Sequence, residues 1–261
     1  MIVFSDIQDG IERVRNRNVC LLRNFLQSKG VFEPLVLKVL DMAREKAKLD
    51  PEVVLSNGFQ NLHKYATAEQ IKILCNYLAR EWGDKSLRDT MARFTYDVVR
   101  NDLGVKGKFY LDHQPIVRFY TPQDFWSENV GHLSLGGHLK IQGPHHDTWF
   151  GHSYEGMNLW MAMGPVRKGN GLSIYPEVSD YIEHDGKYSM PRDQSLGKPV
   201  NFDMSPGDML FFHGEMVHAS ELNRTDETRF VLTTRFSLQP PSFADDPHGG
   251  KSPWITSEDL E

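Results

Sequence analysis

The first hundred residues carry apolar side chains at the three- and four-residue spacing of amphipathic helices. Pro34 suits the first turn of a helix, and Thr67-Ala-Glu-Gln70 has the pattern of a capping box that begins another. Ser86 is the expected cap of a third helix. The predicted helices run from Pro34 to about Lys48, from Thr67 to Gly83 and from Ser86 to just before Gly104, and a short buried strand covers 18–22.

Beyond Gly107 the chain changes to short β-rich runs that are separated by turn residues. Asn170-Gly171, between two of these runs, predicts a hairpin, and Pro206-Gly207-Asp208 predicts a turn before a strand. Many short strands without helices between them are typical of a jelly roll, a sandwich or a barrel. The runs span 116–120, 139–142, 157–166, 172–175, 200–204, 209–212 and 230–236.

These patterns predict an α+β protein, mainly β with flanking helices, built as a single domain over 1–261. Residues 1–106 form a mostly helical scaffold, and residues 107–238 form a jelly-roll core that holds the candidate metal site. No linker separates the two parts, so we expect the helices to pack onto the barrel. Residues 239–261 are polar and rich in Pro and Gly, which predicts an irregular surface tail with Trp254-Ile255 as its candidate for docking.

Composition narrows the class of protein. The 261 residues carry 29 Lys and Arg against 35 Asp and Glu, so the net charge of −6 argues against nucleic acid or an anionic membrane as the main partner. No apolar run approaches the roughly 20 residues that span a membrane, and Met1–Asp6 lacks the basic start of a secretory signal. The two isolated cysteines, Cys20 and Cys75, form no disulfide scaffold, and we expect a cytoplasmic protein.

A histidine and a carboxylate lie two residues apart in Gly143-Pro144-His145-His146-Asp147. The first hundred residues contain only one of the 11 histidines, which places any metal chemistry in this later part of the chain. On an extended strand, residues i and i+2 point to the same face, so His145 and Asp147 can converge on one ion. His146 is the weaker candidate because its i+2 neighbour, Thr148, is a poor ligand.

A third ligand would come from the segment 207–223, which contains His213 and His218. Two histidines and one carboxylate form the facial triad of a mononuclear non-haem iron site, which leaves positions open for other ligands. His218 follows Asp147 by 71 residues. His213 ends an apolar strand and precedes Gly214, which is typical of a structural residue. From the residues alone, both histidines are candidates.

Three arginines lie in apolar strands of the predicted core, where an unpaired arginine is almost never fully buried. Arg229 and Arg235 have the same strand parity and therefore face the same side, so parity does not choose between them. The guanidinium fork suits a carboxylate, which it binds through two hydrogen bonds. Arg118, in the run 116–120, either faces the same site or pairs with a surface carboxylate.

The order of these residues resembles the iron(II)/2-oxoglutarate-dependent oxygenases, and their phytanoyl-CoA-hydroxylase-like branch above all. The resemblance covers residues 107–238, and the combined spacing is specific where any one motif is not. It implies a double-stranded β-helix, which is a cupin-like jelly roll. The matching motifs are His145-x-Asp147, His218-x-Ser220-x-x-Asn223, Arg229, the aromatic strand Leu159–Met163, Asn170-Gly171 and Tyr175-Pro176.

The same resemblance implies the roles of individual residues. It favours His218 over His213 as the third ligand and Arg229 over Arg235 as the anchor of 2-oxoglutarate, because the motif spacing includes them. The implied iron ligands are His145, Asp147 and His218, and the implied 2-oxoglutarate residues are Arg229, Trp160 and Ser220, with Arg118 as the further candidate for this pocket.

Such a site uses Fe(II), 2-oxoglutarate and O₂, releases succinate and CO₂, and oxidises a C–H bond, most simply by hydroxylation. Aromatic and polar residues around the first motif predict a polar small molecule, amino-acid-like or from specialised metabolism, as the substrate. Two other classes stay open: a jelly-roll metalloenzyme that isomerises or cleaves a ring without 2-oxoglutarate, and a non-catalytic barrel that binds a small ligand. The candidate substrate residues are Trp126, His132, His138, Trp149, Phe150, His152, Tyr154 and Glu155.

Overall fold

The computed structural model describes residues 3–7, 9–80, 85–129, 143–245, 247–248 and 250–261. Several sequence-based expectations lie outside these residues: the strand at 139–142, the helix end at Gly83, and the candidate substrate residues His132 and His138. Within the described residues, no helix is long and apolar enough to cross a membrane.

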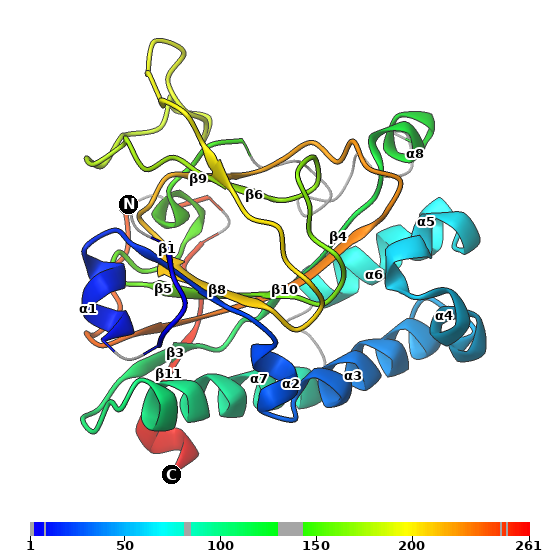
Figure 1. Cartoon of the computed structure of the whole chain (residues 1–261), viewed down its shortest axis with the longest axis horizontal. Helices are drawn as coiled ribbons and strands as arrows, with labels where there is room; N and C mark the ends of the chain where they lie inside the picture. The colour runs from blue at the N-terminus through cyan, green and yellow to red at the C-terminus, as the bar shows by residue number, and fades with distance from the viewer. Residues whose placement is uncertain (1–2, 8, 81–84, 130–142, 246, 249) are drawn as a thin grey trace.

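Two sheets lie face to face and form the jelly roll (Figure 1); their strand pairs are antiparallel except β1 with β2, which is parallel. The larger sheet has the order β1-β2-β8-β5-β10-β3-β11, with β4 also paired with β10, and the smaller sheet has the order β7-β6-β9. The strands of the larger sheet are β1 (Val3–Phe4), β2 (Val19–Leu22), β3 (Tyr110–Asp112), β4 (Ile116–Tyr120), β5 (Met157–Ala162), β8 (Met209–His213), β10 (Arg229–Ser237) and β11 (Trp254–Thr256). Those of the smaller sheet are β6 (Leu172–Ile174), β7 (Val200–Asn201) and β9 (His218–Ser220).

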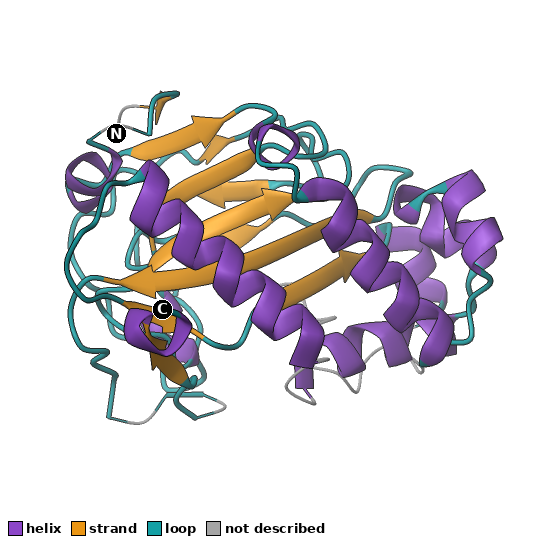
Figure 2. Ribbon diagram, turned by 90° about the horizontal axis from the view of Figure 1, so that it is seen from below, coloured by secondary structure: helices purple, strands orange, loops and turns teal. Residues whose placement is uncertain are grey.

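Helices from the first hundred residues cover the outer face of the larger sheet, as Figure 2 shows. The helix α7 packs against β10 and β3, while α6 packs against β4. The α-helices are α1 (Gly10–Arg15), α2 (Phe25–Ser28), α3 (Phe32–Glu45), α4 (Pro51–Asn57), α5 (Leu62–Tyr65), α6 (Ala68–Arg80), α7 (Lys85–Asp97) and α8 (Gln123–Glu128). The short helices are η1 (Phe59–Asn61), η2 (Val98–Asp102, of π type), η3 (Asp147–Phe150) and η4 (Ser257–Leu260).

Alternation along β10 divides the interior into two cores. Phe230 and Leu232 pack with the helices on the outer face of the sheet, whereas Val231 packs with residues of the smaller sheet. Arg229 and Arg235 share the parity of Val231, and both are buried. They therefore point to the same side, as strand parity predicts, and this side lies between the two sheets.

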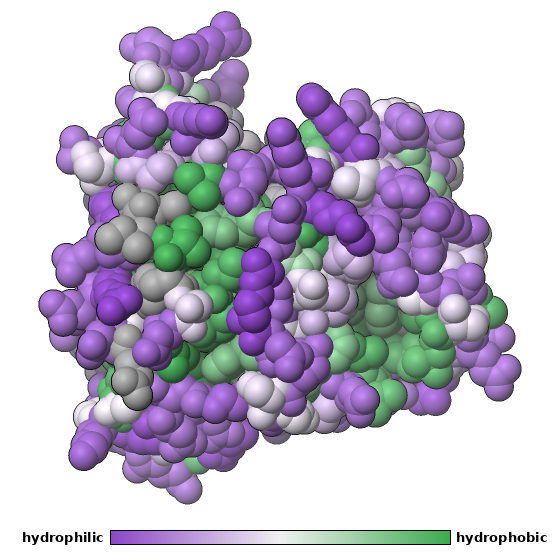
Figure 3. All heavy atoms as spheres, viewed as in Figure 1, coloured by the Kyte–Doolittle hydropathy of each residue, from purple (hydrophilic) through white to green (hydrophobic). Residues whose placement is uncertain are grey.

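The surface is mostly polar on the face seen in Figure 3, which has the orientation of Figure 1. Apolar side chains reach this surface at its centre left and its lower right. The exposed large apolar residues among those described are Val3, Leu37, Val53 and Leu55. Singly exposed apolar residues of this kind are ordinary on the surfaces of globular proteins.

The structure confirms the jelly-roll class and changes some of its details. The capping box at the start of α6 is present: Thr67 N–H donates to Gln70 Oε1 at 3.0 Å, and Gln70 N–H donates to Thr67 Oγ1 at 3.2 Å. Ser86 is not a cap, because α7 begins at Lys85 and Ser86 lies inside it, where its hydroxyl accepts a hydrogen bond from Lys38.

The predicted hairpin at Asn170-Gly171 is wrong. The strands on either side, β5 and β6, belong to different sheets: β5 pairs with β8 and β10, and β6 pairs with β7 and β9. The turn therefore carries the chain from one sheet to the other. Asn170 stabilises it locally, since its Oδ1 accepts the backbone N–H of Arg167 at 2.8 Å.

The last residues of the chain are more ordered than the expected irregular tail. The segment up to Pro253 has no strand or helix among its described residues, but β11 then pairs antiparallel with β3, and η4 follows with a capping box from Thr256 to Asp259. Trp254 and Ile255 dock as part of β11, so the tail extends the edge of the larger sheet.

Candidate metal centre and co-substrate pocket

The three residues predicted to bind metal come from two segments that meet through their backbones. His145 and His218 exchange two hydrogen bonds, N–H to O, of 3.0 and 3.2 Å. His218 begins β9, and Asp147 begins η3 rather than lying on a strand. The intervening His146 is extended, with φ −94° and ψ 143°, and this conformation suffices to turn the side chains of residues 145 and 147 to the same side.

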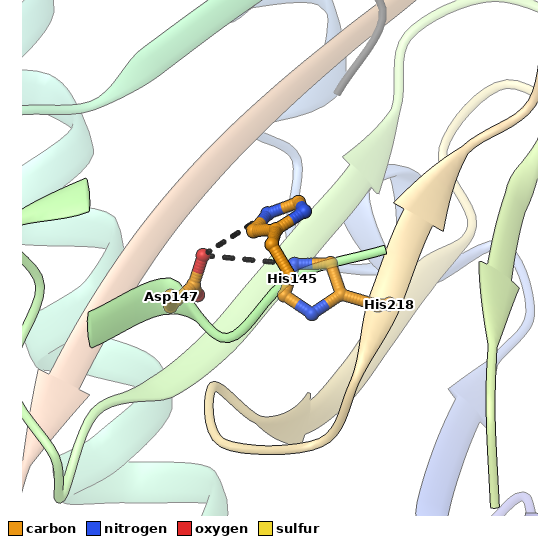
Figure 4. A group of neighbouring side chains, drawn as sticks. All are labelled: His145, Asp147 and His218. Carbon is orange, nitrogen blue, oxygen red and sulfur yellow. Dashed lines mark ion pairs between the residues drawn. The ribbon is translucent and has the colours of Figure 1, made fainter. Parts of the chain in front are cut away.

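The side chains of His145, Asp147 and His218 converge on one point, as Figure 4 shows. Oδ1 of Asp147 lies 3.9 Å from Nε2 of His145 and 3.6 Å from Nε2 of His218, and one ligand atom from each residue falls within 4.8 Å of the others. All three residues are buried. Two imidazole nitrogens and one carboxylate oxygen in this arrangement form the donor set of a facial triad.

Backbone carbonyls fix the orientation of both imidazoles. Nδ1 of His145 lies 2.7 Å from the carbonyl of Gly143, and Nδ1 of His218 lies 2.8 Å from the carbonyl of Met216. Because a carbonyl only accepts, each Nδ1 carries the proton and each Nε2 presents its lone pair toward Asp147. Burial lowers the pKa of His218, and it lowers the pKa of His145 well below the usual range, so both rings are neutral, as metal ligands must be.

This shift predicts how metal binding depends on pH. Protons compete with the metal for Nε2, and a lowered pKa means that this competition begins at a more acidic pH. We expect the affinity for Fe(II) to hold as the pH falls to about 6.5, the ordinary value for histidine, and to weaken only below it. Anaerobic Fe(II) titrations at a series of pH values would measure this, and a loss of affinity centred above that pH would contradict it.

The carboxylate of Asp147 is held on its other side by two buried side chains. Asn158 Nδ2 donates to Oδ2 at 2.7 Å, and Arg235 donates from Nε to Oδ2 at 3.2 Å and from Nη2 to Oδ1 at 3.4 Å. Burial alone would raise the pKa of Asp147, but the positive charge of Arg235 holds it well below its usual range. Asp147 is therefore ionised and ready to bind a cation.

The triad opens into a pocket of about 360 Å³, part of which is open to solvent, between the two sheets. Among the lining residues are Arg118, Trp160 and Ser220, which the sequence assigns to the 2-oxoglutarate pocket. The remaining lining residues are Ile116, His145, Asp147, Asn158, Leu172, Phe212, His218, Thr233 and Arg235.

Arg229 is not among the described residues that line this pocket; it begins β10 and lies behind Ser220, which does line it. Its Nη1 donates to the carbonyls of Asn170 and Gly171 at 2.8 Å each, and its Nη2 donates to Ser220 Oγ at 3.0 Å. Its guanidinium also lies over the ring of Tyr120, 4.2 Å from the centroid. Burial, together with the charge of Arg118, lowers the pKa of Arg229 to about 10, so it stays charged at neutral pH.

Arg229 keeps an unused donor. Its Nε is buried and has no hydrogen-bond partner among the described residues. A buried N–H of a charged group is costly unless it meets an acceptor. A carboxylate that approached the edge formed by Nε and Nη2 would supply one, which fits the residues to a dicarboxylate co-substrate.

The two alternative histidines are occupied elsewhere. Nδ1 of His146 lies 2.9 Å from the carbonyl of Glu215, its Nε2 accepts the N–H of Ile182 at 3.1 Å, and its ring stacks on Tyr181. His213 accepts the N–H of Glu215 at its Nδ1 and lies outside the cluster of His145, Asp147 and His218. Neither ring contributes to the convergent donor set.

The candidate substrate residues divide into those near the metal and those with structural contacts. Phe150 places its ring edge-on to His145, with centroids 5.0 Å apart. Trp149 is buried and donates from Nε1 to the carbonyl of Ile182 at 3.2 Å. In the described part of the chain, Trp126, Trp149, Phe150, His152, Tyr154 and Glu155 are not among the residues that line the pocket.

Sequence reasoning missed Asn158 and Thr233 as pocket residues, and the contact of Arg235 with Asp147. Asn158 carries a usable signal, because it is a polar residue inside the otherwise apolar strand β5, with the same parity as Trp160. Its register partner on β10 is Arg235. That pairing depends on which strands become neighbours, which the sequence pattern does not reveal.

A jelly roll with a His-x-Asp and distal His triad on its inner face is the architecture of the Fe/2-oxoglutarate-dependent oxygenases. The model of the family described as phytanoyl-CoA dioxygenase (PhyH) matches residues 55–231. The chain belongs to the PhyH family, and its cofactors are iron and 2-oxoglutarate, with the His-Asp-His triad in place. No curated protein sequence matches it.

Several solved structures resemble the chain over much of its length. The epimerase SnoN, in complex with Fe³⁺, α-ketoglutarate and nogalamycin RO, has 16% identity and a TM-score of 0.47, with 94% of this chain and 95% of that chain covered. The non-haem monooxygenase ThoJ has 16% identity and a TM-score of 0.46, with 84% and 75% covered. The carbocyclase SnoK from nogalamycin biosynthesis has 12% identity and a TM-score of 0.45, with 93% and 88% covered.

Proposed function

We propose that this protein is an Fe(II)/2-oxoglutarate-dependent dioxygenase that hydroxylates a C–H bond of a polar small molecule and releases succinate and CO₂. His145, Asp147 and His218 are the proposed iron ligands. The observation that carries the proposal is the convergence of Nε2, Nε2 and Oδ1 at the head of a pocket between the two sheets. Neutral imidazoles and an ionised carboxylate suit a borderline divalent metal.

The chain's own residues bind and orient the reactants. When iron and 2-oxoglutarate are bound, they supply the oxidising chemistry that the protein side chains cannot perform. The carbonyls of Gly143 and Met216 hold the two imidazoles in the tautomer that presents Nε2. The buried position of the three ligand residues limits their contact with bulk water, which limits side reactions.

The proposed binding residues for 2-oxoglutarate are Arg229, Ser220, Trp160 and Arg118. Arg229 lies behind the pocket residue Ser220 and close enough to Arg118 for their positive charges to interact, while the carboxylate of Glu221 offsets part of this charge. A dicarboxylate compensates that charge, and the unused Nε–H of Arg229 gives it a buried donor. A metalloenzyme that works without 2-oxoglutarate would not need this buried arginine.

The substrate is proposed to be a polar, amino-acid-like molecule or a specialised metabolite. The pocket is small, and polar side chains such as Asn158 and Thr233 line it beside the metal triad. Those groups suit hydrogen bonds to amines, hydroxyls or carboxylates rather than a long lipid tail. The protein is proposed to act in the cytoplasm without a nucleic-acid or membrane partner.

One experiment tests this function directly. The apo-protein would be titrated with Fe(II) and then 2-oxoglutarate without oxygen, and O₂ would then be added with a panel of amino acids and polar metabolites. We expect one Fe(II) per chain, 2-oxoglutarate binding that requires the metal, and succinate in proportion to an oxidised product. Metal binding with no succinate under any condition would favour a 2-oxoglutarate-independent enzyme, and no metal binding would favour a non-catalytic barrel.

Asp147 also predicts the outcome of the reaction. Halogenating members of the wider superfamily carry Gly or Ala at the corresponding place, which opens a metal position for chloride. Here an anionic carboxylate fills that position and lowers the net charge of the metal, so a halide gains little by binding. We expect a product that gains one labelled oxygen from ¹⁸O₂ in chloride-rich buffer, measured by mass. A chlorinated product would contradict this, and a product lighter by two hydrogens would indicate desaturation or ring closure instead.

A further inference from the structure

We propose that Arg235 and Asn158 are positioning residues that hold the carboxylate of Asp147 so that it offers the metal only Oδ1. This inference rests on the proposed function, because it concerns how the iron ligand is presented. Arg235 shares strand parity with Arg229, and its contacts assign it to the metal ligand rather than to 2-oxoglutarate.

The two oxygens of Asp147 have different surroundings. Oδ2 receives a hydrogen bond from Asn158 at 2.7 Å and one from Arg235 Nε at 3.2 Å. Oδ1 receives one longer hydrogen bond, from Arg235 Nη2 at 3.4 Å, and it is the oxygen nearest the Nε2 atoms of His145 and His218. The hydrogen bonds therefore occupy Oδ2 and leave Oδ1 directed at the metal position.

This asymmetry matters because a carboxylate can bind a metal through one oxygen or through both. Binding through both would use a fourth coordination position and leave fewer for the co-substrate and O₂. Two donors on Oδ2 oppose that mode, because a metal bond to Oδ2 would have to replace buried hydrogen bonds. The hydrogen bonds from Arg235 and Asn158 to Oδ2 thus keep free the coordination positions that the reaction requires.

The pairing of β10 with β5 brings Arg235 and Asn158 together. Arg235 on β10 and Asn158 on β5 are register partners, so both side chains leave the same level of the larger sheet on its inner face. Both residues are buried, Arg235 to 3% and Asn158 to 1% exposed. Neither side chain can move to solvent, and their positions follow from strand pairing alone.

A second carboxylate lies on the far side of Arg235. Asp112 Oδ2 lies 3.7 Å from Arg235 Nη1 and 3.3 Å from Nδ1 of His152, and Asp112 is itself buried. The guanidinium therefore lies between two carboxylates, with hydrogen bonds to Asp147 and a longer charge contact to Asp112. This arrangement keeps the charge of Arg235 beside the metal ligand and away from the Arg229 end of the pocket.

The test measures metal binding separately from turnover. Co(II) replaces Fe(II) as a probe, since its visible absorption reports the number and kind of its ligands. In Arg235→Gln and Asn158→Ala we expect the Co(II) affinity to fall by about 10–100-fold, the effect typical of residues that orient a ligand, and the Co(II) spectrum to change. The concentration of 2-oxoglutarate needed for half-maximal rate should change little at saturating metal.

The matched control is Arg167→Gln, which makes the same substitution at an exposed ion pair with Glu227 and should leave both readouts unchanged. Thermal unfolding of each apo-variant checks the fold, and if Arg235→Gln does not fold, Asn158→Ala carries the test. Unchanged Co(II) affinity and spectrum in folded variants would overturn the proposal that Arg235 and Asn158 position Asp147. A higher 2-oxoglutarate requirement with unchanged metal affinity would instead assign Arg235 to the co-substrate. Failure of the unaltered protein to bind metal would refute the proposed function itself.

Discussion

Replacing His218 with alanine is expected to lower turnover by at least about 10³-fold, because a metal centre contributes several kcal/mol to catalysis and its loss removes that contribution. The same loss is expected for His145→Ala and Asp147→Ala. The reason is geometric, since the three ligand atoms lie within 4.8 Å of one another and each fills one position of the set. Iron content after anaerobic loading and succinate formation would both be measured.

His213→Ala is the matched control for this prediction. His213 lies in the same segment and is also an imidazole, but it stands outside the convergent cluster. We expect this variant to bind iron as the unaltered protein does. If His213→Ala lost its iron while His218→Ala retained normal activity, the assignment of the third ligand would be wrong.

Arg229→Ala is expected to raise the concentration of 2-oxoglutarate required for half-maximal rate by roughly 10²-fold or more. Truncating one partner of a buried, hydrogen-bonded charge pair costs roughly 2–5 kcal/mol, much of it from leaving the other charge unpaired. Arg229 is 1% exposed and has an unused Nε–H, so it meets the conditions for such a pair. Binding of 2-oxoglutarate to the iron-loaded, oxygen-free protein would measure the change.

The control is Arg224→Ala, which makes the same substitution at an exposed position of the same segment. It should leave the 2-oxoglutarate requirement unaltered. Iron content should be normal in both variants, because Arg229 contacts the Asn170-Gly171 turn and Ser220 rather than the metal ligands. Unchanged affinity in Arg229→Ala, with a loss in Arg235→Ala, would transfer the anchoring role to Arg235.

Local patterns predicted the parts of the site that depend on nearby residues. The i, i+2 spacing of His145 and Asp147 needs only one extended residue between them, and His146 provides it. Strand parity placed Arg229 and Arg235 on one face because alternation is a property of a single strand. The likeness of the combined motifs to a known family then separated His218 from His213, which spacing alone did not do.

The pattern of residues along the chain did not predict which distant strands pair with one another. The contact between Arg235 and Asp147 exists because β10 and β5 are neighbours in a particular register, which no local signal specifies. The same limit explains the wrong hairpin at Asn170-Gly171, since turn residues show that the chain bends but not which sheet it enters next. The strand β11 was missed because three residues in a polar segment give too short a pattern to recognise.

The central place of β10 has a consequence for how the protein folds. This strand pairs with β3, β4 and β5, all of which precede it in the chain by many residues. During synthesis, β3, β4 and β5 emerge before β10 and cannot pair with it until it has been made. Pairing such distant segments also closes large loops, and the entropy lost in closing them precedes the stabilising contacts. The larger sheet is therefore expected to form late and slowly, with strand edges open to aggregation in the interval. Arg235 arrives with this strand, so the metal-binding residues reach their final arrangement only when the sheet does.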